Sequence, residues 1–182
     1  MDKKDLRKYY KQVRRNIPET TKKNESKKIV QKFLNIFYED NYDGVLLYAP
    51  LPDEADIFPV LEKVSGKTDV CFPRVNGETM DFYKVSDKSN LFKGNFDVFE
   101  PSDECEAIVL DSAKKYLIAL PGIVFDREGY RIGYGKGYYD KYLFAHKNID
   151  FYKVGICFNE CLCDSVMPDE YDQKADVVLT AD

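Results

Sequence analysis

Two helical patterns open the chain. In the first, apolar residues recur every three or four positions as far as residue 17, and Pro18 then ends the run. In the second, apolar residues between positions 29 and 37 follow the same spacing. We therefore expect two amphipathic helices before residue 40. Their apolar positions are Leu6, Tyr9 or Tyr10, Val13 and Ile17 in the first helix, and Ile29, Phe33, Ile36 and Phe37 in the second.

After Gly44 the pattern changes to short apolar runs. Residues 45–49 are continuously apolar between turn residues, which is typical of a strand buried on both faces, as in a parallel sheet. Strands that alternate with helices predict an α/β fold. We expect one domain over residues 1–182, with a mostly parallel central sheet flanked by helices in a Rossmann-like arrangement. Further strands are predicted at 69–72, 80–85, 117–120, 154–158 and 177–180, and further helices at 57–64 and 137–147.

Residues 86–116 have the least regular pattern. They contain Gly94, Pro101 and scattered charges. This composition predicts a long loop, which either covers an open site or forms a surface excursion.

The composition supports a folded core and limits the partners. Hydrophobic residues make up 44% of the chain and charged residues 32%, which provides a core beneath a charged exterior. Aromatic residues make up 14%; most would fill the core, and some could line a pocket for a flat ligand. The net charge of −5 argues against nucleic acid or an anionic membrane as the main partner, because both require a basic excess.

The start of the chain is a local exception to this acidic balance. Its lysines and arginines either form a solvated helix face or contact a polyanion. The basic residues of this segment are Lys3, Lys4, Arg7, Lys8, Lys11, Arg14, Arg15, Lys22, Lys23, Lys27 and Lys28.

Cysteine usage indicates a reducing compartment, and we expect a cytoplasmic protein. The five cysteines are an odd number without disulfide-scaffold spacing, and no apolar signal segment follows the basic start. Cys161 and Cys163 with the lone His146 match zinc-site spacing poorly, because a second ligand pair is missing. Reduced thiols are the expected state. For assembly, we expect a monomer or a weak homo-oligomer.

Residues 121–143 carry the clearest chemical signal. Glycines at alternate positions from 133 to 137 allow close backbone approach to a ligand, and Arg131 and Lys136 add positive charge. A helix predicted to follow this loop would direct its N-terminal N–H groups at an anion. Asp140, one turn into that helix, is a candidate ligand for a divalent cation. Glycine spacing alone would equally fit a flexible loop, and Gly137 after Lys136 excludes a Walker A loop.

The same segment resembles the signature of a known enzyme family. Pro-Gly-x-x-Phe-Asp from Pro121, followed by Gly-x-Arg-Ile-Gly-x-Gly-Lys-Gly-Tyr-Tyr-Asp from Gly129, is similar to the 5-formyltetrahydrofolate cyclo-ligase family. The resemblance extends in order over nearly the whole chain. Its other parts are Lys-x-x-x-Arg at Lys3 and Arg7, Ala49 to Glu54, Phe72-Pro73-Arg74, Glu100-Pro101 and Asp176 to Thr180.

The resemblance implies three groups of site residues. Catalytic roles fall on Lys136, Arg131 and Tyr138. ATP contacts fall on Lys3, Lys4, Arg7, Arg131, Ile132, Gly133, Tyr134, Gly135, Lys136, Gly137, Tyr138 and Tyr139. Substrate contacts fall on Ala49, Glu54, Tyr134, Gly135, Lys136, Gly137 and Tyr138, and magnesium contacts on Asp140 and Asp176.

Some of these residues also have plain structural explanations. Glu54 could be a helix-start carboxylate, and Lys3 and Arg7 could simply face solvent. Tyr138 and Tyr139 cannot both face the site, because neighbours on a helix point about 100° apart. The chain also departs from the family, with Tyr171 where many members have His and Phe96 where some have Trp. Either ring at position 96 could stack on a pterin.

The implied reaction converts 5-formyltetrahydrofolate and ATP to 5,10-methenyltetrahydrofolate, ADP and phosphate, with Mg²⁺. ATP would phosphorylate the formyl oxygen, and N10 would then attack the activated carbon. Two alternatives use the same glycine loop. One is a nucleotide-binding regulatory protein without turnover, and the other is a small kinase that acts on a different acceptor. Neither explains the ordered matches outside residues 121–143.

Overall fold

A mostly parallel sheet forms the centre of the molecule. The computed structural model describes residues 2–94 and 98–182. The strand order of the central sheet is β11-β9-β6-β1-β2-β3, and all neighbours pair in parallel except β2 and β3, which are antiparallel. The α/β fold with a mostly parallel sheet is therefore confirmed. Its strands are β1 (Gly44–Leu46), β2 (Asp69–Asn76), β3 (Thr79–Lys84), β6 (Lys115–Pro121), β9 (Asp150–Ile156) and β11 (Val177–Leu179).

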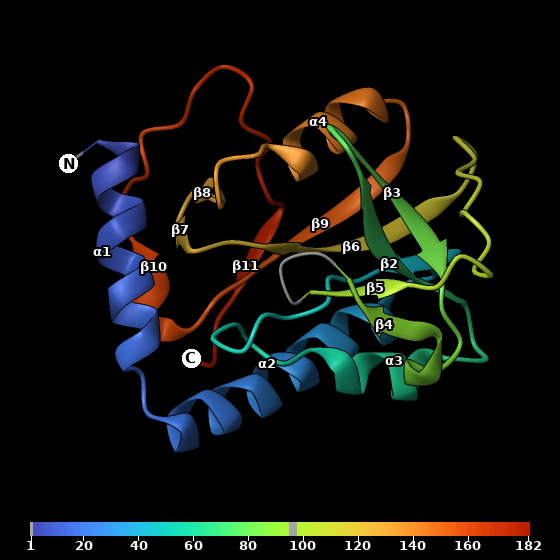
Figure 1. The fold of residues 1–182 in the computed structure, drawn as a ribbon, viewed down its shortest axis with the longest axis horizontal. Coiled ribbons are helices and arrows are strands. Elements are labelled where there is room, and N and C mark those ends of the chain that lie inside the picture. The colour runs from blue at the N-terminus through green and yellow to red at the C-terminus, as the bar shows by residue number, and fades with distance from the viewer. Residues whose placement is uncertain (1, 95–97) are drawn as a thin grey trace.

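Helices lie on both sides of this sheet (Figure 1). In that view α2 and α3 run below the strands, α4 lies above them, and α1 stands at one end. Burial of the apolar face of α2, which includes Ile29 and Phe33, anchors this helix to the core. The helices are α1 (Lys3–Asn16), α2 (Glu19–Glu39), α3 (Phe58–Val64) and α4 (Tyr138–Ala145).

The expected elements are present, with some different bounds. The helix α2 begins at Glu19, well before the first residue of the apolar pattern, Ile29. The pattern misses the first half of the helix because that half buries polar side chains such as Glu25 and Ser26. Strand β1 ends at Leu46, although the following residues to Ala49 stay buried. The strand predicted at 69–72 continues to 76, where a turn with Gly77 at φ +63° leads into β3.

Residues 86–116 contain more regular structure than a long loop. They include a short 3₁₀ helix, η1 (Lys88–Asn90), and an antiparallel pair of strands, β4 (Leu91–Lys93) and β5 (Phe99–Pro101). The prediction of a long loop over the whole of residues 86–116 was therefore wrong, because a 3₁₀ helix and two strands lie within this stretch. Three-residue strands with exposed aromatics, such as Phe92 and Phe99, give too little alternation to be recognised. Phe96 lies outside the described residues.

A second small sheet lies beside α1. It has the order β10-β7-β8, with β7 (Val124–Asp126), β8 (Arg131–Ile132) and β10 (Leu162–Cys163). The hairpin of β7 and β8 belongs to residues 121–143, called here the glycine-rich segment. Leu6 of α1 packs against Val124 and Ile132 of this hairpin in a separate apolar cluster. This packing fixes α1 next to the segment with the chemical signal. No helix among the described residues is long and apolar enough to cross a membrane.

Candidate functional site

The glycine-rich segment leaves the C-terminal end of β6, forms the hairpin of β7 and β8, and then enters α4 through residues 133–137, here called the glycine loop. Asp126 of the family motif has a structural task. One of its carboxylate oxygens accepts hydrogen bonds from the N–H groups of Glu128 and Tyr130, and the other accepts one from Val166. The motif residue therefore closes the hairpin turn and places the glycine loop.

The glycine loop has the backbone shape that its glycines predict. Gly135 and Gly137 have φ values of +100° and +68°, in the left-handed region that other residues adopt at a cost. Gly137 is the N-cap of α4, and no side chain caps that helix. Lys136 is exposed and makes no ion pair or hydrogen bond with any described residue. The free N–H groups and this cation favour an anionic ligand at the loop.

One face of α1 contacts the glycine loop. Arg7 donates a hydrogen bond from Nε to the carbonyl of Gly133 at 2.8 Å, and the ammonium of Lys11 lies 5.1 Å from the ring centre of Tyr134. The interpretation of Arg7 as a solvated residue was therefore wrong. Lys4 is exposed, and its side chain makes no hydrogen bond or ion pair with any of the described residues.

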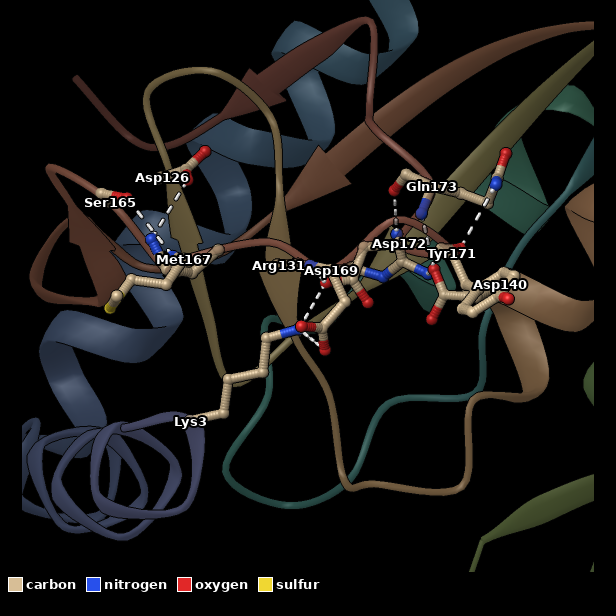
Figure 2. Close-up of polar contacts among 11 residues, drawn as sticks. Lys3, Asp126, Arg131, Asp140, Ser165, Met167, Asp169, Tyr171, Asp172 and Gln173 are labelled. Atoms are coloured by element: carbon tan, nitrogen blue, oxygen red, sulfur yellow. Dashed lines mark hydrogen bonds and ion pairs between the residues drawn. The ribbon is translucent and has the colours of Figure 1, made fainter. Parts of the chain in front are cut away.

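Lys3 begins this face of α1 and is held by two carboxylates (Figure 2). Its Nζ lies 2.6 Å from Asp169 and 2.5 Å from Asp172, both in the segment before β11. Burial acts to lower the pKa of Lys3, but the hydrogen bonds to Asp169 and Asp172 outweigh it and raise the pKa. Lys3 is thus fully charged and already paired. A phosphate would have to compete with these carboxylates for it.

Arg131 and Asp140 form an ion pair beside the loop. The guanidinium of Arg131 donates from one terminal nitrogen to Asp140 Oδ1 at 2.9 Å and from the other to the carbonyl of Gln173 at 2.8 Å (Figure 2). The N–H of Gln173 donates to the same Asp140 oxygen at 3.0 Å. Asp140 therefore forms its ion pair with Arg131. Arg131 is only 8% exposed, so its guanidinium is directed at Asp140 and Gln173 and is largely shielded from solvent.

The two predicted magnesium ligands differ in what they offer. In Asp140 only Oδ1 is bonded to the described residues, which leaves Oδ2 as a hard oxygen donor at the start of α4. In Asp176 the N–H of Lys153 contacts Oδ2 at 2.7 Å and its ammonium lies 3.4 Å from Oδ1. Within residues 2–94 and 98–182 no three His, Cys, Asp or Glu side chains form a metal-binding group. Asp140 fits Mg²⁺, which usually takes one or two carboxylates together with phosphate and water.

A buried polar network surrounds Glu54. Tyr134, from the glycine loop, donates its hydroxyl to Glu54 Oε1 at 2.9 Å, and the N–H of Leu51 donates to Oε2 at 2.9 Å. The guanidinium of Arg14 lies 3.6 Å from Glu54 Oε1, 3.0 Å from Asp53 and 2.5 Å from the Tyr134 hydroxyl. Glu54, in the turn after β1, and Tyr134, in the glycine loop, are therefore joined by a direct hydrogen bond.

Glu54 does not begin a helix. It closes the turn of residues 51–54 by donating its own N–H to the Leu51 carbonyl, whereas α3 starts later, at Phe58. Asp56 takes the role of helix-start carboxylate and accepts a hydrogen bond from the N–H of Phe58. The side chain of Glu54 is therefore not used to begin α3, and its carboxylate instead joins Leu51, Tyr134 and Arg14.

Burial sets the ionisation of this network. Desolvation raises the pKa of Glu54, and the charge of Arg14 together with hydrogen bonds from Leu51 and Tyr134 acts in the opposite direction. Desolvation and the charge of Glu54 both raise the pKa of Tyr134, so its hydroxyl stays protonated and can donate. The network combines one cation with two carboxylates. It presents a net negative charge and suits a ligand with N–H donors.

Tyr138 and Tyr139 point to different places, as helical geometry requires. The Tyr138 hydroxyl donates to the carbonyl of Gly77 in the turn between β2 and β3. Tyr139 packs edge-on against Phe82, with ring centres 6.3 Å apart, and burial and the nearby Glu54 charge raise its pKa. Tyr138 thus lies at the rim of the site and Tyr139 faces the core.

Two other predicted contacts have buried side chains. Ala49 is 5% exposed within the main core, and Ile132 is 2% exposed in the cluster beside α1. Contact with a ligand by either residue would therefore use backbone atoms.

The sequence did not single out Arg14 and Tyr48. Arg14 is 2% exposed, and both residues line a small pocket with Glu54, Gly122 and Cys161. A signal for Arg14 was present, because it lies on the same helical face as Lys3 and Arg7, seven positions after Arg7. Tyr48 carried no such signal, since it reads as one more residue of a buried strand.

The cysteines form no metal-binding group with other side chains in the described part of the chain. All five are free, and the ring nitrogen Nδ1 of His146 contacts the carbonyl of Tyr142 at 2.9 Å. Cys161 is fully buried, and desolvation raises its pKa to about 12, which keeps it a thiol at neutral pH.

Comparison with known proteins gives one consistent result. The model of the 5-formyltetrahydrofolate cyclo-ligase family matches residues 1–181. A mouse 5-formyltetrahydrofolate cyclo-ligase is 27% identical over 99% of this chain and 94% of its own length, and a probable enzyme of that name from Schizosaccharomyces pombe is 30% identical over 75% and 74%. The NMR structure of 5,10-methenyltetrahydrofolate synthetase from Aquifex aeolicus is 32% identical, has a TM-score of 0.84 and aligns over 100% of this chain and 90% of its own. The chain thus belongs to the 5-formyltetrahydrofolate cyclo-ligase family.

Proposed function

We propose that this protein converts 5-formyltetrahydrofolate to 5,10-methenyltetrahydrofolate at the cost of ATP. The observation that carries the proposal is the hydrogen bond between Tyr134 of the glycine loop and Glu54. Direct phosphoryl transfer requires the two substrates to lie side by side. A phosphate-binding loop that touches the predicted folate-binding carboxylate meets this requirement.

The folate would lie against the negative side of the Glu54 network. A pterin ring has several N–H donors, and a buried carboxylate is a strong acceptor for them. The Glu54 side chain is only 6% exposed, so an acceptor site on its carboxylate that lacks a hydrogen bond is costly. Tyr138, at the rim beside Gly77, would border the rest of the substrate.

The triphosphate would lie on the glycine loop. Lys136 is the cation there without a carboxylate partner among the described residues, and the uncapped N-terminus of α4 adds N–H donors. Arg7 holds the loop through Gly133, and Lys3 would exchange its carboxylates for phosphate oxygens. Mg²⁺ would neutralise phosphate charge when bound, with Asp140 as its best-placed protein ligand and Asp176 as a weaker candidate.

The formyl group is a poor electrophile because it is amide-like, so the proposed reaction begins with its activation by ATP. The amide-like formyl oxygen would attack the γ-phosphorus, ADP would leave, and the N5-bound carbon would carry a phosphate. N10 would add to that carbon, the carbon–oxygen bond would break to release phosphate, and loss of the N10 proton would give the methenyl bridge. The chain would contribute positioning and charge: Lys136 would stabilise the transferring group, and Glu54 would hold the pterin.

An absorbance assay for the methenyl product tests this proposal. Product should form only when ATP, Mg²⁺ and 5-formyltetrahydrofolate are all supplied. Equal product without ATP would contradict the mechanism. ATP binding without any turnover would favour the regulatory alternative, and a stable phosphorylated product without the methenyl absorbance would favour the small kinase.

A further inference from the structure

Arg14 links three parts of the chain that the proposed site needs. It projects from α1, pairs with Asp53 and Glu54 in the turn after β1, and donates to the hydroxyl of Tyr134 in the glycine loop. A further donation, to the carbonyl of Gly122 at 3.3 Å, reaches the start of the glycine-rich segment. A planar guanidinium with five donors can serve several acceptors at fixed angles, which a lysine ammonium cannot do.

The burial of this network makes Arg14 more than a surface ion pair. The side chains of Arg14 and Glu54 are 3% and 6% exposed, so neither charge is well hydrated. Without a cation, a carboxylate in this position would take up a proton to avoid a buried charge. The charge on Glu54 therefore depends on Arg14.

The other groups around Glu54 do not replace this cation. Asp53 is a second anion and draws on the same guanidinium, and the tyrosines are neutral donors. The charged or titratable groups that act on Glu54 are Arg14 from α1, Asp53 from its own turn, Tyr48 from the segment after β1, Tyr134 from the glycine loop and Tyr139 from α4.

We infer that Arg14 is a positioning residue for folate binding: it keeps Glu54 ionised and holds Glu54 and Tyr134 in one fixed arrangement before the substrates arrive. The inference rests on the proposed function in one respect, namely that Glu54 contacts the folate. Arg14 itself contacts neither the reacting atoms nor the phosphates in this account.

The test compares Arg14→Met, Arg14→Lys and the control Arg15→Met. Arg15 is the next residue on α1 and is exposed, and its side chain makes no hydrogen bond or ion pair with any described residue, so its loss removes the same charge without disturbing the network. The measurements are the titration of the Glu54 carboxyl carbon by NMR and the KM for 5-formyltetrahydrofolate across mildly acidic to mildly alkaline pH.

In Arg14→Met we expect a higher Glu54 pKa and a KM for folate raised about tenfold or more at neutral pH, the size expected for one charge-assisted hydrogen bond. The KM should recover as the pH rises through the new pKa, because Glu54 then ionises again. The kcat at saturating folate should change less. Arg15→Met should behave as the wild type. An unchanged Glu54 titration, or an unchanged KM for folate, would overturn the inference.

Arg14→Lys keeps the positive charge but changes the hydrogen-bond geometry. It also keeps the inference testable if Arg14→Met fails to fold. Its ammonium should keep Glu54 ionised, so the titration should match the wild type, but it cannot also serve Tyr134, and the KM for folate should still rise. A KM for folate equal to that of the wild type would overturn the inference.

A double variant decides whether Arg14 acts through Glu54. In a Glu54→Gln background, Arg14→Met should cause little further loss of folate affinity, because the carboxylate it supports is gone. Fully additive losses would reduce Arg14 to a general structural role and overturn the inference. A wild-type protein that forms no methenyl product would refute the proposed function alone, since the NMR titration still decides whether Arg14 controls Glu54.

Discussion

The glycine loop and the Glu54 network are adjacent, yet their polar groups are used in opposite ways. In the loop, Lys136 is exposed without a partner among the described residues. In the network, Glu54 and Arg14 are buried and bonded from several sides. We therefore expect a ligand with its own negative charge to complete the loop, whereas the network is already formed without a ligand.

Lys3 and Arg131 stand between these extremes. Both are cations predicted to meet ATP, but each is already paired with carboxylates, Lys3 with Asp172 and Arg131 with Asp140. Lys136 should therefore contribute most to charge neutralisation at the transferring phosphate. The following variants test this contrast, from the largest expected effect to the smallest.

Lys136→Met should have the largest effect on rate. Removal of this charge should lower kcat by about 10²-fold, the size typical of one preorganised electrostatic group, and should also weaken ATP binding. The melting temperature of the ligand-free protein should hardly change, because Lys136 is exposed and its side chain makes no hydrogen bond or ion pair with any described residue. Lys8→Met is the control, because it also removes an exposed lysine that has no ion-pair partner within residues 2–94 and 98–182. A lower melting temperature together with a normal kcat at saturating ATP would mean that Lys136 stabilises the fold and does not act on the phosphate.

Glu54→Gln should damage folate use and spare ATP. The amide keeps the shape and the acceptor oxygen but loses the charge, so the KM for 5-formyltetrahydrofolate should rise about 10- to 100-fold. The Kd for ATP should change little, and Glu39→Gln, at an exposed position on α2, should change neither. Normal folate kinetics with impaired ATP binding would reverse the assignment of Glu54.

The folate KM should also depend on pH through Glu54. Desolvation raises the pKa of this carboxyl, so protonation in acid begins at a higher pH than for an exposed glutamate. The ionised form accepts from the pterin donors more strongly than the protonated form, so the KM for folate in the wild type should rise as the pH falls through this pKa. In Glu54→Gln the KM should be flat over the same range, and an identical pH profile in the two proteins would exclude Glu54 as the titrating group.

Asp140→Asn should raise the Mg²⁺ concentration needed for half-maximal activity by several-fold, up to about tenfold. The asparagine oxygen can still accept a hydrogen bond from Arg131, so the contact between β8 and α4 should be retained. Asp176→Asn is the comparison, and it should have the smaller effect because Lys153 already contacts both oxygens of Asp176. The reverse order would place the metal nearer to Asp176.

Asp172→Asn should have the smallest effect and the opposite sign. The pair with Lys3 is partly exposed, so its loss is worth at most about 1 kcal/mol, and the Kd for ATP should fall by about two- to fivefold as Lys3 becomes available. Asp164→Asn, in the same segment but fully exposed, is the control. Weaker ATP binding in Asp172→Asn would mean that Asp172 positions Lys3 and does not compete for it.

The sequence predicted the main elements because their signals are local. The buried strand from Val45 and the helix after Gly137 could be recognised from apolar runs and from glycine placement, and both are present. The strands of three or fewer residues in β4, β5, β7, β8 and β10 were missed, since such strands are too short for an alternating pattern.

The site was predicted as a set of residues but not as a set of contacts. The choice between Tyr9 and Tyr10 is settled by tertiary packing, with Tyr10 against the small cluster beside α1 and Tyr9 53% exposed. The ion pair of Arg131 with Asp140 and the burial of Arg14 also depend on segments distant in sequence. A single chain without its fold gives no means of matching such partners.

The measurement that tests the account most directly is the fate of the formyl oxygen. 5-Formyltetrahydrofolate labelled with ¹⁸O in its formyl group should be converted with ATP and Mg²⁺, and the released phosphate analysed by mass spectrometry. If ATP phosphorylates that oxygen, the label should appear in inorganic phosphate with one labelled oxygen for each methenyl product. Unlabelled phosphate, formed at the same rate as the methenyl product, would contradict phosphorylation of the formyl oxygen.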